Sequence, residues 1–119
     1  MKYQDLKTRT LKFAASVWKL CDSLPNKYSY NAYSNQLIRS SSSVGANYRA
    51  ALRGKSTADF INKLKIVEEE ADETCYFLEL LIEVNPDLEK TVKPVLNESR
   101  EITAIIVASI KTARSKNVK

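Results

Sequence analysis

The sequence contains no histidine among its 119 residues and only two glycines, Gly45 and Gly54. Without histidine, the chain lacks the Ser-His and Cys-His pairs that activate nucleophiles, and also the Glu-x-x-His ligands of di-iron bundles. Two glycines nine residues apart cannot supply a P-loop or a GxGxxG phosphate-binding loop. We therefore expect a protein that is not an enzyme and that binds no cofactor.

Cysteine, proline and long apolar runs are also scarce. Cys21 and Cys75 belong to no CxxC spacing, which argues against a zinc site and favours two small buried hydrophobic side chains. Two glycines and three prolines are too few for a turn-rich β protein. Residues 1–9 are polar rather than typical of a signal peptide, and no apolar run approaches the length of a membrane span. We therefore expect a helical cytoplasmic protein with no membrane partner.

The formal net charge of +5 is unevenly distributed along the chain. Residues 1–56 carry a net charge of +8, residues 57–89 carry −8, and residues 90–119 carry +5. Two interpretations stay open. The basic segments can attract a polyanion such as nucleic acid, or they can lie beside the acidic segment on the solvated surface of a bundle.

Apolar residues at helical spacing divide the chain into four segments, about 5–24, 32–53, 57–84 and 91–114. The clearest stripe repeats at steps of three and four along residues 57–84. It consists of Phe60, Leu64, Val67, Ala71, Thr74, Leu78 and Leu81. Four helices of this length with short links predict one all-α domain, residues 1–119, folded as an antiparallel up-down-up-down four-helix bundle.

The second segment has a weak centre, because Ser40–Ser43 and the following Val44–Asn47 include several residues of low helix propensity. Small residues here would allow a neighbouring helix to pack closely, which is the favoured interpretation. The alternative is a small pocket lined by hydroxyl groups and Asn47. We also expect residues 26–31 to form a polar turn before this helix, and Gly54 to end it in the left-handed conformation.

Residues 74–84, with the sequence TCYFLELLIEV, are apolar on nearly all sides, so this part of the helix needs more than one partner. One chain offers too little surface to cover it. We therefore predict self-association, as a closed ring, through an interface that includes Tyr76, Phe77, Leu80 and Val84.

Acidic residues crowd the middle of the same segment, at Glu68, Glu69, Glu70, Asp72 and Glu73. Consecutive residues of a helix point in different directions, and no second carboxylate-rich helix is present to complete a metal site. We therefore expect no bound metal, and a solvated or intersubunit acidic face instead.

Residues 36–82 resemble a known family in two runs, LIRSSSSVGANYRA and FINKLKIVEEEADETCYFLELL. These runs are similar to the four-helix-bundle proteins encoded by intervening sequences within bacterial 23S rRNA genes and by many free-standing bacterial genes. The resemblance implies an up-down bundle that assembles as a homopentamer. It also implies a distant likeness to the accessory variability protein of diversity-generating retroelements, a basic pentamer that binds nucleic acid and a reverse transcriptase. The family supplies no catalytic residues.

Two functional hypotheses follow. The first is a nucleic-acid-binding accessory protein for RNA or DNA, in which the candidate contacts are Arg39, Arg49, Arg53 and Lys55, with Lys7, Arg9 and Lys12 less favoured. The alternative for these basic residues is pairing with the acidic helix of the same or a neighbouring subunit. The second hypothesis is a scaffold that holds a protein partner and has no nucleic-acid role.

Overall fold

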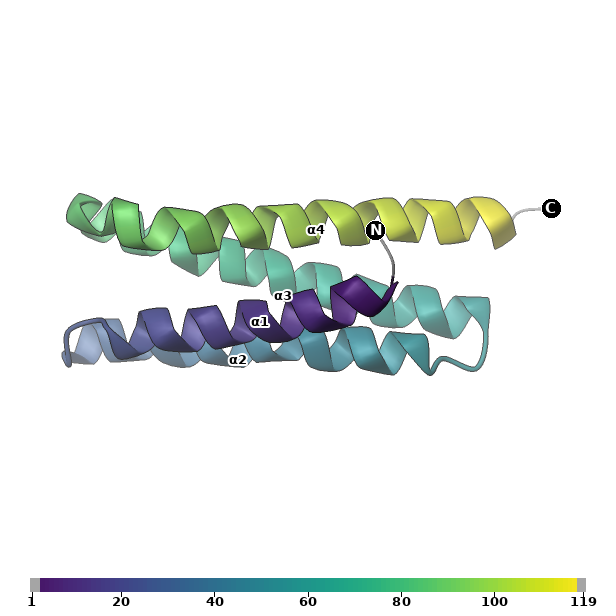
Figure 1. Cartoon of the computed structure of the whole chain (residues 1–119), viewed down its shortest axis with the longest axis horizontal. Helices are drawn as coiled ribbons and strands as arrows, with labels where there is room; N and C mark the ends of the chain where they lie inside the picture. Colours follow the sequence, from purple (N-terminus) through teal and green to yellow (C-terminus); the bar gives the residue numbers. More distant parts are fainter. Residues whose placement is uncertain (1–2, 118–119) are drawn as a thin grey trace.

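The computed structural model describes residues 3–117 and consists of four α-helices (Figure 1). They are α1 (Tyr3–Asp22), α2 (Tyr28–Leu52), α3 (Thr57–Val84) and α4 (Glu89–Asn117), with a short 3-10 helix, η1 (Pro86–Leu88), before α4. No strand occurs within these residues. The expected all-α four-helix bundle is therefore confirmed, whereas assembly into a ring stays a prediction.

Successive helices run in opposite directions, and each helix packs against two others (Figure 1). Helices α1 and α3 both pack against α2 and α4. The bundle is elongated, with principal dimensions of 52 × 21 × 20 Å. Its two ends are therefore separate surfaces, one formed by the C-terminal ends of α2 and α4 and the other by the C-terminal ends of α1 and α3.

Local hydrogen bonds fix the start of α3 and of η1. The Ser56 hydroxyl accepts a hydrogen bond from the Asp59 amide at 3.1 Å, as expected for an N-cap. The Asn85 side chain accepts one from the Asp87 amide at 3.2 Å and so caps η1. Both caps follow from the residue types at these positions.

The expectation of a left-handed Gly54 is wrong, because neither glycine has a positive φ. Glycine is needed there for close approach instead. A Cβ atom at this position would lie 3.0 Å from the carbonyl oxygen of Ala51 and 3.2 Å from the amide nitrogen of Phe60. The missing side chain therefore lets the link from α2 to α3 pass close to both helices.

Two helices are longer than the sequence predicts. Helix α2 begins at Tyr28, inside the stretch expected to be a turn, and its N-cap, Lys27, makes no side-chain capping bond. Helix α4 begins at Glu89 and includes Pro94. Proline has no N–H, so the Lys90 carbonyl loses its helical donor, but Lys90 and Pro94 are exposed and water can bind that oxygen.

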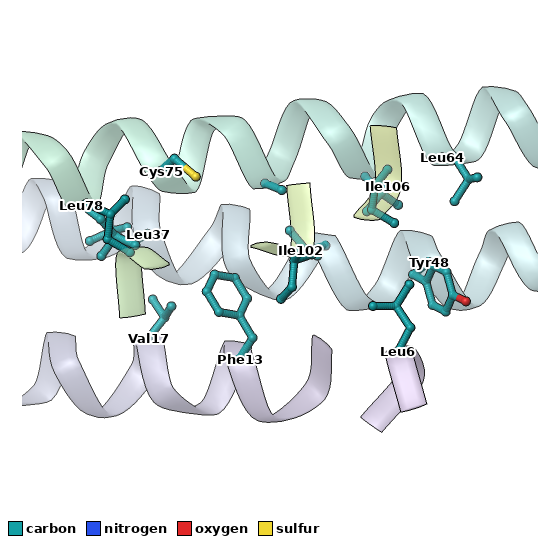
Figure 2. Close-up of a cluster of buried hydrophobic side chains, with 14 of the residues drawn as sticks. Leu6, Phe13, Val17, Leu37, Tyr48, Leu64, Cys75, Leu78, Ile102 and Ile106 are labelled. Carbon is teal, nitrogen blue, oxygen red and sulfur yellow. The ribbon is translucent and has the colours of Figure 1, made fainter. Parts of the chain in front are cut away.

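The hydrophobic core runs along the axis of the bundle. Figure 2 shows Phe13 and Val17 of α1 directed toward the side chains of Leu37, Leu78 and Ile102 from the other three helices. All residues of the α3 stripe predicted from sequence are buried except Phe60, which is half-buried. The helical spacing therefore identified the buried side of α3 correctly.

The serine-rich centre of α2 lies where the helices approach closely. Ser40 is fully buried, and its hydroxyl forms a 2.7 Å hydrogen bond with that of Thr74 on α3. A Cβ atom on Gly45 would lie 3.2 Å from the hydroxyl oxygen of Thr10 on α1. Asn47 donates to the carbonyl and hydroxyl oxygens of Ser43 in its own helix, at 2.9 and 2.8 Å. These contacts support close packing rather than a hydroxyl-lined pocket.

Candidate nucleic-acid interface

Basic residues from three elements gather where α2 and α4 end. Helices α2 and α4 run in the same direction, so their C-terminal turns lie at one end of the bundle together with the link between α2 and α3 (Figure 1). We call this region the basic end and define it by Arg49, Arg53, Lys55, Arg114 and Lys116. The first three of these residues are predicted contacts from the sequence, whereas Arg114 and Lys116 are not.

The five cations of the basic end are exposed, and none of them has an ion-pair partner among residues 3–117. The nearby carboxylate of Asp59 is engaged by the backbone, because it accepts a hydrogen bond from the Lys55 amide at 3.2 Å. Cations in the last turn of a helix also offset its macrodipole. That role accounts for single residues near each helix terminus. It leaves the combined positive charge of this end without a matching carboxylate among the described residues.

Arg39, the remaining candidate, is separated from the other three. Its guanidinium lies 3.2 Å from a carboxylate oxygen of Glu70 and also binds Glu73, both on α3. The hydrogen bond that Arg39 donates to Glu73, and then the one that it donates to Glu70, raise the pKa of Arg39. Arg39 is therefore paired with the acidic helix of the same chain, which is the alternative interpretation given for the basic residues.

Arg9, a less favoured candidate, is also paired. Its guanidinium donates to both carboxylate oxygens of Glu98 at 2.6 and 2.7 Å, and to Glu101 at 2.8 Å. These hydrogen bonds, led by the one to Glu98, raise the pKa of Arg9. Arg9 consequently joins α1 to α4 and is not available to an external anion.

A groove of about 790 Å³ opens at the basic end between α2, α3 and α4. Helix α1 does not extend as far as α3 and α4 at this end (Figure 1). The described part of α1 therefore does not lie between α2 and α4 there. The groove has apolar walls from all three helices and two lysines, Lys55 and Lys116, in its lining. It therefore combines apolar and cationic surface in one place.

A smaller groove of about 270 Å³ lies between α1 and α2. Its lining includes Lys7, Ser42, Gly45 and Arg49. This is the nearest feature to the pocket considered for the serine-rich segment, although Asn47 does not line it. Lys7 of α1 lines this groove together with Arg49 and so extends the cationic surface of the basic end onto α1, whereas Lys12 lines neither groove.

The acidic face of α3 is divided between two neighbouring helices. Glu70 and Glu73 lie toward α2, where they pair with Arg39. Glu68, Glu69 and Asp72 line a shallow groove that also includes Thr103 of α4. No group of three or more His, Cys, Asp or Glu side chains suited to a metal ion occurs within residues 3–117.

The residues predicted to form an oligomer interface lie toward the opposite end. Tyr76 is 58% exposed and Val84 is 54% exposed, while Phe77 and Leu80 are half-buried. The Phe77 ring packs edge-on against Tyr76, with centroids 5.4 Å apart. We call these four residues the aromatic patch. Leu11 and Trp18 on α1 are also exposed, at 59% and 56%, and are not among the interface residues predicted from the sequence.

Comparisons with known proteins identify a family and solved structures with a similar fold. The sequence pattern of the family described as 23S rRNA-intervening sequence protein matches residues 3–108. A crystal structure of a protein of unknown function from the S23 ribosomal protein family of Bacteroides thetaiotaomicron is 40% identical, with a TM-score of 0.84. The match covers 93% of this chain and 99% of that one. No curated protein matches the chain. None of the helices within residues 3–117 is long and apolar enough to cross a membrane.

Proposed function

The chain belongs to the family of 23S rRNA-intervening sequence proteins, and within that family we propose that it binds RNA or DNA through its basic end, without catalysing a reaction. The observation that carries this proposal is the set of five exposed cations without ion-pair partners within the described chain. Arg49, Arg53 and Lys55 are then phosphate contacts, joined by Arg114 and Lys116.

Electrostatics favours a polyanion as the ligand. Like charges gathered at one end repel each other, and the resulting positive potential raises the local concentration of anions. A phosphate backbone offers several negative charges in a row, so one ligand neutralises several of the cations at once. Arg49 lies in the last turn of α2 and Arg53 is the C-cap of that helix, so both lie at the same end of the bundle, where they can contact adjacent phosphates.

The test is the affinity for a structured RNA, measured by fluorescence anisotropy. Reversing two charges of the basic end, with Arg49→Glu and Arg53→Glu, should weaken binding by at least about 100-fold, because two charge-assisted contacts are lost. The matched control is Lys90→Glu with Lys93→Glu, which changes the net charge equally at the opposite end, beside Asp87 and Glu89. Equal weakening by both double variants, or no weakening with helicity retained, would overturn the proposal.

We also propose that the protein self-associates through the aromatic patch, as a homo-oligomeric ring of five. Exposed Tyr76 and Val84 beside the half-buried Phe77 support this choice. Several copies would present several basic ends to one nucleic acid and so raise the overall affinity. The same patch is what favours a protein-interaction scaffold as the alternative function.

The oligomeric mass in solution tests the self-association. Light scattering should give a multiple of the 13.5 kDa chain mass, and Tyr76→Glu with Val84→Glu should lower it toward that of one chain. The control is Leu11→Glu with Trp18→Glu, which should leave the mass unchanged. A monomeric wild type, or dissociation only in the control, would contradict the interface.

A further inference from the structure

The groove at the basic end has a composition that phosphate binding alone does not explain. Its apolar lining comes from Leu52 of α2, Phe60 of α3 and Ile105 and Ala113 of α4. Leu52 is 37% exposed, and the other three side chains are half-buried against the core. Water therefore reaches an apolar surface here that a ligand would cover.

The two lysines of the groove come from different elements. Lys55 belongs to the link between α2 and α3, and Lys116 to the last turn of α4. Both are exposed and unpaired within the described chain. A ligand that fills the groove must therefore match an apolar interior with more than one cation in its lining.

We infer that the groove receives unpaired bases of a single-stranded nucleic acid, whose flanking phosphates bind Lys55 and Lys116. This inference rests on the proposed function, since it specifies which form of nucleic acid the basic end selects. A single strand alternates flat apolar bases with anionic phosphates and so matches the groove in both respects. A duplex keeps its bases stacked inside and presents mainly phosphates at its surface, leaving the apolar lining uncovered.

The size and the aromatic content of the groove agree with this ligand. Its volume of about 790 Å³ lies in the range of about 300–1,000 Å³ typical of sites for small organic molecules. Unpaired bases commonly stack on aromatic side chains, and Phe60 supplies a ring in the lining. The hydroxyl groups of Ser109 and Thr112 also line the groove. Binding of a base does not depend on hydrogen bonds to them, because a base of any identity can stack on an aromatic ring. The expected preference is therefore for single strands over duplexes, with little sequence selectivity.

The test fills the groove without changing any charge. Ala108→Leu with Thr112→Leu adds bulk at two exposed lining positions of α4. The control, Asn97→Leu with Ala104→Leu, adds the same residues at exposed positions of α4 outside the groove. Anisotropy is measured with a labelled unstructured RNA strand and with the duplex of the same length.

Wild-type protein should bind the single strand at least about tenfold more tightly than the duplex, the effect expected from stacking of one base. The groove-filling variant should lose about that preference while its duplex affinity changes less than about twofold, and the control should keep the preference. Equal wild-type affinities, or a preference unaffected by groove filling, would overturn the inference but leave the proposed function standing. Absence of binding to either RNA would reject the proposed function itself. Displacement of an acidic amphipathic peptide by groove filling, with single-strand binding unchanged, would assign the groove to a protein partner instead.

Discussion

Arginines in the middle of the bundle differ from those at the basic end in how their charge is balanced. Arg9 and Arg39 each bind two carboxylates, and Arg100 lies 3.1 Å from Glu79. Arg49 and Arg53 have no such partner within residues 3–117. The comparison shows that the net charge of a helix does not locate a binding surface, because neighbouring helices neutralise part of it.

For the arginines that follow one another along α2, the antiparallel packing of α2 on α3 explains why Arg39 is paired and Arg49 is not. The middle of α2 lies beside the acidic middle of α3, so Arg39 meets Glu70 and Glu73. The end of α2 lies beside the start of α3, where the carboxylate in the first turn, Asp59, binds the Lys55 amide. The same residue type on one helix consequently stabilises the fold at one position and remains available to a ligand at another.

Among these arginines, substitution of Arg9 should have the largest effect on stability. Replacing Arg9 with Gln removes a bidentate, partly buried ion pair with Glu98. The free energy of unfolding should therefore fall by about 1 kcal/mol. Arg53→Gln removes an exposed cation that has no ion-pair partner among residues 3–117, so it should leave the free energy of unfolding unchanged. Denaturation by urea followed by circular dichroism measures both. A larger loss for Arg53→Gln would mean that the basic end is a structural feature.

Among the substitutions of Arg39, Arg49 and Arg53, Arg39→Gln should have the smallest effect on nucleic-acid binding. Its charge is already balanced by two carboxylates, so the affinity for RNA should change by less than about twofold. Fluorescence anisotropy with the same structured RNA checks this, with Arg53→Gln as the matched substitution. A loss at Arg39 equal to that at Arg53 would show that RNA displaces Glu70 and Glu73.

Much of the fold could be predicted from the sequence, since it depends on local spacing. The stripe from Leu64 to Leu81 predicted the buried side of α3, and the expected segment 57–84 has the bounds of that helix, whose N-cap is Ser56. The start of α2 at Tyr28 could not be predicted, because Lys27 provides no side-chain cap and tertiary packing decides where the helix begins.

The candidate site was predictable only in part. Arg49, Arg53 and Lys55 are close in sequence, so their proximity needed no tertiary information. Lys116 joins them only because α2 and α4 run in parallel, which the up-down topology would have indicated. Helix α4 continues to Asn117, beyond the end expected at about residue 114, and Lys116 lies in that added part. The pairing of Arg39 with Glu70 and Glu73 depends on the register of α2 against α3. The spacing of residues along a single helix gives no information about that register.

The salt dependence of RNA binding tests the central claim most directly, because each neutralised phosphate releases condensed counterions. With about five phosphates contacted, log K plotted against log salt concentration should have a slope of about −3.5 for a single strand to about −4.5 for a duplex. Arg49→Gln with Arg53→Gln should reduce the magnitude of that slope by about 1.4 to 1.8. A slope near zero, or one that is the same in wild type and variant, would contradict the assignment of the basic end as the nucleic-acid-binding surface.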